Sequence, residues 1–411
     1  MTVSVLALLL ALGVVAALTP PNNWDAQSYH LSRQVFWMQQ GSVAHFPTEN
    51  LRQTTMPPFA EFAGLHLMIL AGNDHWANLV QWFALAITAI GASLIARELG
   101  ATARGQALAA LLVVCNPMAA MQAVNPKNDV VTAAWLCMLA LYVLRVHRAG
   151  RCRAVDAALL GATLGLLLLT KGTAYLFALP LCAVAAVAIL RAQGIAGLRT
   201  GLLIGLAALL LNAGHFARNW QEFGAPLGPG DAHTGTFPLM NERFDAPALA
   251  SNVVRNLAMH AATPDPALNA ALERAITRVH ERWLGISPGD PQTTYGFEGF
   301  RVVHGAFSED SAPAPVHLAL ALLVVPLLLL RGRGNAQAAL LACVVAAAFI
   351  LFCWLLRWQP WNARLHLPLV SLLCPVAATL IARGGNGIAA LACAALALAV
   401  VLPSVLYNAQ K

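Results

Sequence analysis

The amino-acid sequence predicts an all-α polytopic membrane protein, on three observations. Of its 411 residues, 59% are hydrophobic and 10% are charged, whereas a soluble globular chain has roughly 45–50% apolar and 25% charged residues. The mean hydropathy is +0.65. Apolar stretches long enough to cross a bilayer as helices recur along the whole chain. A soluble protein is excluded, and we expect a single transmembrane domain over 1–411, with no soluble domain at the carboxy terminus.

Hydropathy predicts about eleven membrane-spanning helices. The first apolar segment lacks the positively charged lead of a secretory signal, which favours a retained helix over a cleaved one. The apolar run 155–190 is divided because Thr170-Lys171-Gly172 interrupts it, and a charge beside a helix breaker indicates a turn at the membrane surface. The expected spans lie near residues 2–18, 77–96, 105–124, 130–147, 155–170, 173–190, 200–215, 314–330, 335–355, 365–382 and 386–407.

The distribution of charge predicts the orientation of these spans. Arginines gather in the connections on one side, for example Arg97, Arg148, Arg191 and Arg331, and the positive-inside rule makes that side cytoplasmic. The formal net charge of +7 therefore reflects topology, and we expect no nucleic-acid partner. The opposite side holds most of the acids and histidines, and it holds both long connections, 19–76 and 216–313.

Each long connection contains an amphipathic pattern. Leu31, Val35 and Met38 follow helical spacing in the first connection, and Leu268 to Trp283 continue such a pattern in the second. Short amphipathic helices that lie on the membrane surface are expected at both places.

Two acids lie at the outer ends of spans, where a membrane-bound substrate would present its polar group. Asp25 directly follows the first span, and Asp129 opens the fourth. Because Asp is also a favoured helix-capping residue, the capping and catalytic interpretations both stay open. For Ser308-Glu309-Asp310-Ser311, ahead of the next span, a helix cap is preferred to an acceptor pocket.

Cations are expected at the same depth as these acids. They are Lys171, Arg218, Arg357 and Arg364, joined by His215 and His366. Any one of them alone is typical of a snorkelling anchor. Their convergence with two carboxylates favours a site for a lipid phosphate, which needs cationic donors.

Several motifs together resemble a known family. They include Trp24-Asp25, Tyr29-His30-Leu31, Arg52-Gln53 with Glu61, Lys127-Asn128-Asp129, Thr170-Lys171-Gly172, Arg218-Asn219 and Arg364-Leu365-His366. This pattern is similar to bacterial family 39-like glycosyltransferases of the GT-C superfamily, which includes protein O-mannosyltransferases and lipid A aminoarabinose transferases. The resemblance covers most of the chain, and its specificity rests on the first loop.

The resemblance implies a function. Such enzymes move a sugar from a polyprenyl-phosphate carrier to an acceptor outside the cytoplasm, here a lipid, glycan or protein, and the site would face the periplasm from the bacterial inner membrane. By resemblance, Asp25 and Asp129 are the catalytic acids. The expected substrate contacts are Lys171, Arg218, Arg364, His366, Tyr29, His30, Arg52 and Glu61.

A mechanism follows from these positions. Asp25 would act as general base towards an acceptor hydroxyl, in a single displacement that inverts the anomeric centre, while Lys171, Arg218 and Arg364 stabilise the leaving phosphate. A divalent cation bound by Asp25 is the alternative role for this acid, although the first loop has no fixed metal-binding spacing. The rival functions are a polytopic transporter or flippase for a lipid-linked or small polar substrate, and a non-catalytic scaffold.

Overall fold

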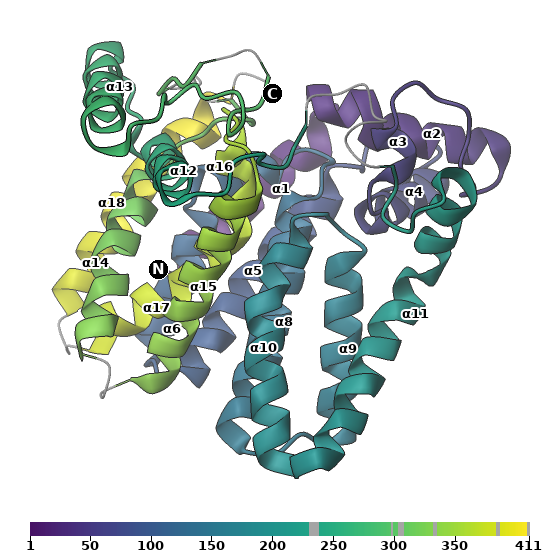
Figure 1. The fold of residues 1–411 in the computed structure, drawn as a ribbon, viewed down its shortest axis with the longest axis horizontal. Coiled ribbons are helices and arrows are strands. Elements are labelled where there is room, and N and C mark those ends of the chain that lie inside the picture. Colours follow the sequence, from purple (N-terminus) through teal and green to yellow (C-terminus); the bar gives the residue numbers. More distant parts are fainter. Residues whose placement is uncertain (230–237, 297–298, 303–307, 332–334, 384–386, 409–411) are drawn as a thin grey trace.

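The computed structural model describes the chain except residues 230–237, 297–298, 303–307, 332–334, 384–386 and 409–411 (Figure 1). Throughout the described ranges the protein is helical, with isolated β-bridges but no strand. A helix lies at each of the expected spans. These helices are α1 (Thr2–Leu18), α5 (Leu79–Glu98), α6 (Ala103–Val114) with α7 (Pro117–Gln122), α8 (Asp129–Ala149), α9 (Ala154–Leu168), α10 (Ala174–Gln193), α11 (Gly197–Phe223), α14 (Pro315–Arg331), α15 (Ala336–Leu355), α17 (Leu367–Arg383) and α18 (Gly387–Leu406).

These helices have the length and composition of membrane spans. In the described chain, 5 helical segments are long and apolar enough to cross a bilayer. One of them, Ala174–Phe223, comprises α10 and α11 joined by the short 3-10 turn η2 (Gly194–Ala196). The remaining expected spans are shorter apolar helices. A polytopic all-α membrane fold is therefore confirmed.

The short helices of the two long connections lie at one end of the bundle, the upper end in Figure 1. The first connection forms the π-helical turn η1 (Ala26–His30), α2 (Leu31–Gln40), α3 (Arg52–Thr55) and α4 (Phe59–Ala71). The second forms α12 (Ala246–Ala258), the 3-10 turn η4 (Met259–Ala261), α13 (Pro266–Val279) and the π-helical turn η5 (His280–Leu284), and α16 (Asn362–Leu365) joins α15 to α17. The helices expected near 31–38 and 268–283 are present, while α4 and α12 were not predicted.

Two boundaries differ from the predicted ones. The span expected over 105–124 is broken between α6 and α7, because Pro117 has no backbone N–H to continue the helix. The Asn116 side chain caps the new helix by accepting a hydrogen bond from the Met118 N–H at 3.0 Å. The helix expected over 200–215 continues as α11 to Phe223, so Arg218 is helical rather than part of a loop.

The centre of the bundle is formed by α5, α6, α8 and α17, which pack closely. Helix α8 is the most enclosed of the five long helical segments, because 72% of its most apolar 18-residue stretch is buried inside the protein. Small residues allow this packing: a side chain added at Gly105 would come within 3.0 Å of Ala101 and Ala382. The rigid α8 and α17 begin at the upper end of the bundle in Figure 1, where they carry Asp129 and adjoin Arg364.

The orientation gives a labelling prediction. Ala267 at the start of α13 and Ala149 at the end of α8 are both exposed, and they lie at opposite ends of the bundle. In intact cells an impermeant maleimide should label Ala267→Cys and leave Ala149→Cys unlabelled until the membrane is opened. The reverse pattern would contradict the positive-inside assignment.

Candidate functional site

Asp25 forms an ion pair with Arg364, although the two residues lie at opposite ends of the sequence. Their side chains are only 12% and 16% exposed. Asp25 precedes η1 but makes no side-chain cap, so the capping interpretation is not supported. Burial alone would raise the pKa of Asp25, but the charges of Arg364 and Lys127 outweigh it and hold the pKa well below its usual range.

A second acid pairs with a cation beside the first pair. Lys171, in the turn between α9 and α10, donates to Asp129 Oδ1 at 2.5 Å and to Asn128 Oδ1 at 3.1 Å. Asn128 also donates to the Thr170 carbonyl at 3.0 Å, which ties this turn to the start of α8. Asn128, the residue ahead of α8, makes no side-chain cap either. The predicted turn at Thr170-Lys171-Gly172 is therefore real, and it brings Lys171 to Asp129.

Asp310 connects the two pairs. Its Oδ1 accepts from Lys127 Nζ at 2.9 Å and from Arg364 Nη1 at 3.3 Å. Arg364 lies within electrostatic reach of Asp129 as well. We call these six residues, Asp25, Asp129, Asp310, Lys127, Lys171 and Arg364, the ionic cluster. It opposes three carboxylates with three cations at one end of the helices.

The first loop borders the ionic cluster on the side of Asp25. Burial and the adjacent charge of Asp25 hold the pKa of Tyr29 well above its usual range, so its phenol stays a hydrogen-bond donor. The Arg52 guanidinium lies over the Tyr29 ring, 5.8 Å from its centroid. His30 Nδ1 and Glu61 Oε1 are 2.5 Å apart and both residues are buried. Four sequence-predicted contact residues therefore lie together here.

Arg218 lies in a neighbouring group rather than in the ionic cluster. It is close enough to Arg33 and His45 to affect their protonation. The next residue of α11, Asn219, has its Oδ1 2.9 Å from His45 Nε2, and His215, one turn earlier, lies beside Asn219. Within the described ranges, the Arg218 guanidinium has no acidic partner within ion-pair distance.

The described contacts of His366 and Arg357 are with residues outside the ionic cluster. His366 Nδ1 is 3.0 Å from His260 Nε2, and the His366 ring packs against Phe349 and Phe352. The contacts of His366 are thus with another histidine and two phenylalanines rather than with an acid of the ionic cluster. Arg357 binds Glu242 and loop carbonyls.

Sequence reasoning missed two members of the ionic cluster. Lys127 was noted only as part of a motif, and Asp310 was assigned to a preferred helix cap. That cap is wrong, because α14 begins at Pro315 and the Asp310 carboxylate binds Lys127 and Arg364. The available signal was the Glu309-Asp310 pair on the acid-rich side of the membrane.

The carboxylates of this site do not fit a bound divalent cation. No group of three or more His, Cys, Asp or Glu side chains that could hold a metal occurs in the part of the chain that the structure describes. Each acid of the ionic cluster instead has a Lys or Arg partner, whereas metal-binding carboxylates direct their oxygens at the ion.

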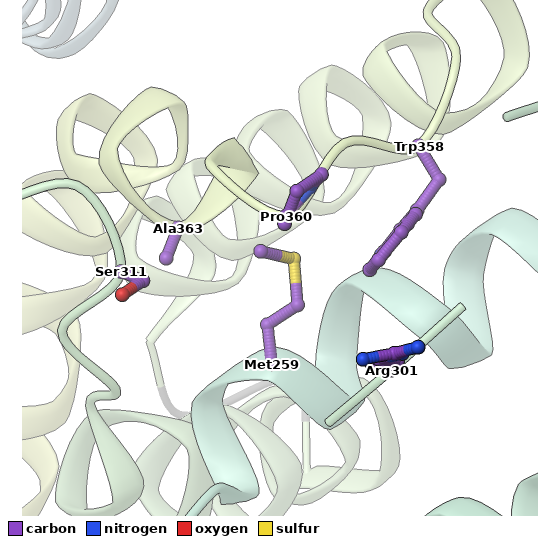
Figure 2. A pocket seen from close by; sticks show the side chains of 6 residues that line it. All are labelled: Met259, Arg301, Ser311, Trp358, Pro360 and Ala363. Atoms are coloured by element: carbon purple, nitrogen blue, oxygen red, sulfur yellow. The ribbon is translucent and has the colours of Figure 1, made fainter. Parts of the chain in front are cut away.

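A small cavity lies between the loop before α14, the end of α12 and the segment before α16 (Figure 2). Its volume is about 10 Å³, which is about the size of one water. It is lined by Met259, Arg301, Ser311, Trp358, Pro360 and Ala363. Two of its lining residues, Ser311 and Ala363, are the sequence neighbours of Asp310 and Arg364.

Similarity to solved structures identifies the fold. The crystal structure of ArnT from Cupriavidus metallidurans bound to undecaprenyl phosphate matches with a TM-score of 0.55 and 17% identity, over 91% of this chain and 59% of that chain. The model of the family described as dolichyl-phosphate-mannose-protein mannosyltransferase matches residues 55–216. This chain has the GT-C fold. No curated protein sequence matches it.

A second GT-C structure shows how far the likeness extends. The Archaeoglobus fulgidus oligosaccharyltransferase, tethered with an acceptor peptide, matches with a TM-score of 0.50 and 13% identity, over 99% of this chain and 55% of that chain. The chain therefore spans between half and two thirds of the length of these proteins. The ionic cluster lies at the ends of apolar helices of this fold.

Proposed function

We propose that this protein is a membrane glycosyltransferase that transfers a sugar from a polyprenyl-phosphate carrier to an acceptor hydroxyl at the outer membrane surface. The observation that carries the proposal is the buried Asp25–Arg364 pair within the ionic cluster. A carrier lipid holds its sugar phosphate at headgroup depth, so both a carboxylate and phosphate-binding cations are needed at the ends of spans. The GT-C fold supports the same chemistry.

Arg364 is the group we expect to meet the phosphate. Its Nε is buried and has no hydrogen-bond partner in the described structure. An unpaired buried donor is unfavourable, and a phosphate oxygen is a strong acceptor that would satisfy it. Lys171 and Lys127 would share the negative charge that develops on the leaving phosphate.

Phosphate binding would also prepare Asp25 for catalysis. In the free protein Asp25 is a weak base, since its ion pair with Arg364 keeps its pKa low. When a phosphate competes for Arg364, that attraction weakens and the pKa of Asp25 rises towards its usual range. Asp25 can then take the proton of the acceptor hydroxyl as the hydroxyl oxygen attacks the anomeric carbon and the carrier phosphate leaves.

The carrier tail has a candidate site on α11. An apolar groove of about 540 Å³ is lined by Leu209, Phe216, Ala217, Trp220, Pro226 and Leu227. Arg218, next to Ala217, supplies a cation beside this groove without an acidic partner in the described residues. The combination fits a lipid that carries a phosphate, and we infer that the polyprenyl chain approaches along α11.

Substitution of Arg218 tests carrier binding without removing the partner of any carboxylate in the described residues. Arg218→Gln should weaken binding of undecaprenyl phosphate to the purified protein by about tenfold to a hundredfold, the loss of one charge-assisted hydrogen bond. The matched control is Arg274→Gln, an exposed arginine on α13. Equal affinity of both variants and the wild type would remove Arg218 from the carrier site.

The transporter alternative is less well supported by the placement of charge. Transporters commonly bind their substrate near the membrane midplane. Among the described spans, the ion pair of Glu98 with Arg145 lies at the far end of α5 and α8, and the ionic cluster lies at the outer end. This distribution favours chemistry at the membrane surface.

A further inference from the structure

Glu309 is a buried carboxylate that binds the two turns leading to Asp25 and to Asp129. Its side chain is 0% exposed. Its Oε2 accepts hydrogen bonds from Asn23 Nδ2 at 3.2 Å and from Asn125 Nδ2 at 2.9 Å. Its Oε1 accepts one from Asn408 Nδ2 at 3.1 Å.

These contacts fix which way two asparagine side chains point. A carboxylate only accepts hydrogen bonds, so each amide must turn its NH₂ group towards Glu309 and its oxygen away. The Asn23 oxygen then accepts from the backbone N–H groups of Asp25 and Ala26, at 3.0 and 3.4 Å. The Asn125 oxygen accepts from the Lys127 N–H at 3.2 Å.

The backbone of Glu309 is tied to the same region. Its carbonyl accepts a hydrogen bond from the Gln122 side chain, which lies at the end of α7. The next residue, Asp310, points the other way and binds Lys127 and Arg364. Glu309 and Asp310 therefore join three segments that are distant in sequence, namely the start of the first loop, the turn between α7 and α8, and the segment ahead of α14.

We propose that Glu309 is a positioning residue, which sets the backbone of the Asp25 turn and of the turn bearing Lys127 through the orientation of Asn23 and Asn125. This inference rests on the proposed function for its catalytic meaning. The structural role of Glu309 does not depend on that function, because it concerns how the two turns are held in the free protein. Groups that act through a second layer of hydrogen bonds in this way orient the side chains that meet the substrate.

Two substitutions separate positioning from direct catalysis. Glu309→Met keeps the approximate length of the side chain but removes both acceptors, so Asn23 Nδ2 and Asn125 Nδ2 lose their hydrogen bonds to the carboxylate. Asn125 keeps the Met121 carbonyl and the Gln81 side chain as partners, so the larger effect is expected at Asn23. Glu309→Gln can keep an oxygen at the Oε2 position and place its NH₂ group towards Asn408, whose amide can turn to accept it. Asn408→Ala is the matched control, because it removes the contact on Glu309 Oε1 and leaves the Oε2 bonds to Asn23 and Asn125 in place.

The primary readout is backbone hydrogen–deuterium exchange, with undecaprenyl phosphate binding as the second. In Glu309→Met, exchange in peptides that cover residues 22–27 and 123–128 should rise by about tenfold or more, and affinity for undecaprenyl phosphate should fall by about tenfold. Glu309→Gln and Asn408→Ala should stay within about threefold of the wild type in both measurements. Exchange elsewhere in the bundle should not change.

Each other outcome has a defined meaning. Wild-type exchange at both turns in Glu309→Met would overturn the proposal. Loss of binding in Glu309→Gln with unchanged exchange would also overturn it, since the charge of the carboxylate would then act directly. If the wild type itself does not bind undecaprenyl phosphate while exchange changes as expected, the positioning role is supported and the proposed carrier is rejected.

Discussion

Asp25→Asn should abolish sugar transfer while the protein remains folded. A carboxylate that takes the acceptor proton in the transition state contributes about 10²–10⁴-fold to the rate, and a carboxamide cannot replace it. Asn has nearly the same shape, and Arg364 keeps its contact with Asp310 at 3.3 Å, so the fold should survive. The measurement is the initial rate of transfer from a labelled polyprenyl-phosphate-linked sugar, beside the elution profile of the purified variant.

The control for this substitution is Asp74→Asn. Asp74 is an exposed acid after α4, at the same end of the bundle, and it lies outside the ionic cluster. This variant should transfer sugar at the wild-type rate. Full activity of Asp25→Asn would reject Asp25 as the base, whatever the result for Asp74.

Arg364→Gln should have the largest effect on stability. Arg364 is the partner of both Asp25 and Asp310, and removing one partner from a buried ion pair lowers the free energy of unfolding by about 3–5 kcal/mol. The same change removes the expected phosphate contact. Thermal unfolding in detergent and titration with undecaprenyl phosphate measure the two effects.

Arg364→Lys provides the comparison for Arg364→Gln. Lysine keeps the positive charge but lacks the planar fork that reaches Asp25 and Asp310 together. It should therefore recover part of the stability and less of the binding. Wild-type unfolding and wild-type affinity in Arg364→Gln would show that the ion pair is not central to the site.

The sequence predicts the membrane helices well because burial in a bilayer imposes a long apolar stretch on each one. The turn at Lys171 was predictable for the same reason, since a charge and a glycine are unfavourable within a span. Helix α4 was missed because only 13 residues form it, and such a short apolar segment in a loop has several possible structures.

The sequence predicts the depth of the site residues along the helices, but it does not predict which way their side chains point. The depth of Asp25, Lys171 and Arg364 follows from their places at span ends, whereas side-chain contacts depend on how the helices pack. Arg364 and His366 illustrate this limit. Residues two positions apart in a helical turn point about 200° apart around the axis. Arg364 therefore binds Asp25 while His366 packs against His260.

The most direct test is an experimental structure of the protein with undecaprenyl phosphate. The account predicts that the lipid phosphate contacts Arg364 and lies beside Lys171, that the Asp25–Arg364 ion pair is loosened, and that the polyprenyl tail follows the groove on α11. A phosphate bound elsewhere, with Asp25 and Arg364 still paired and no lipid in the groove, would contradict it.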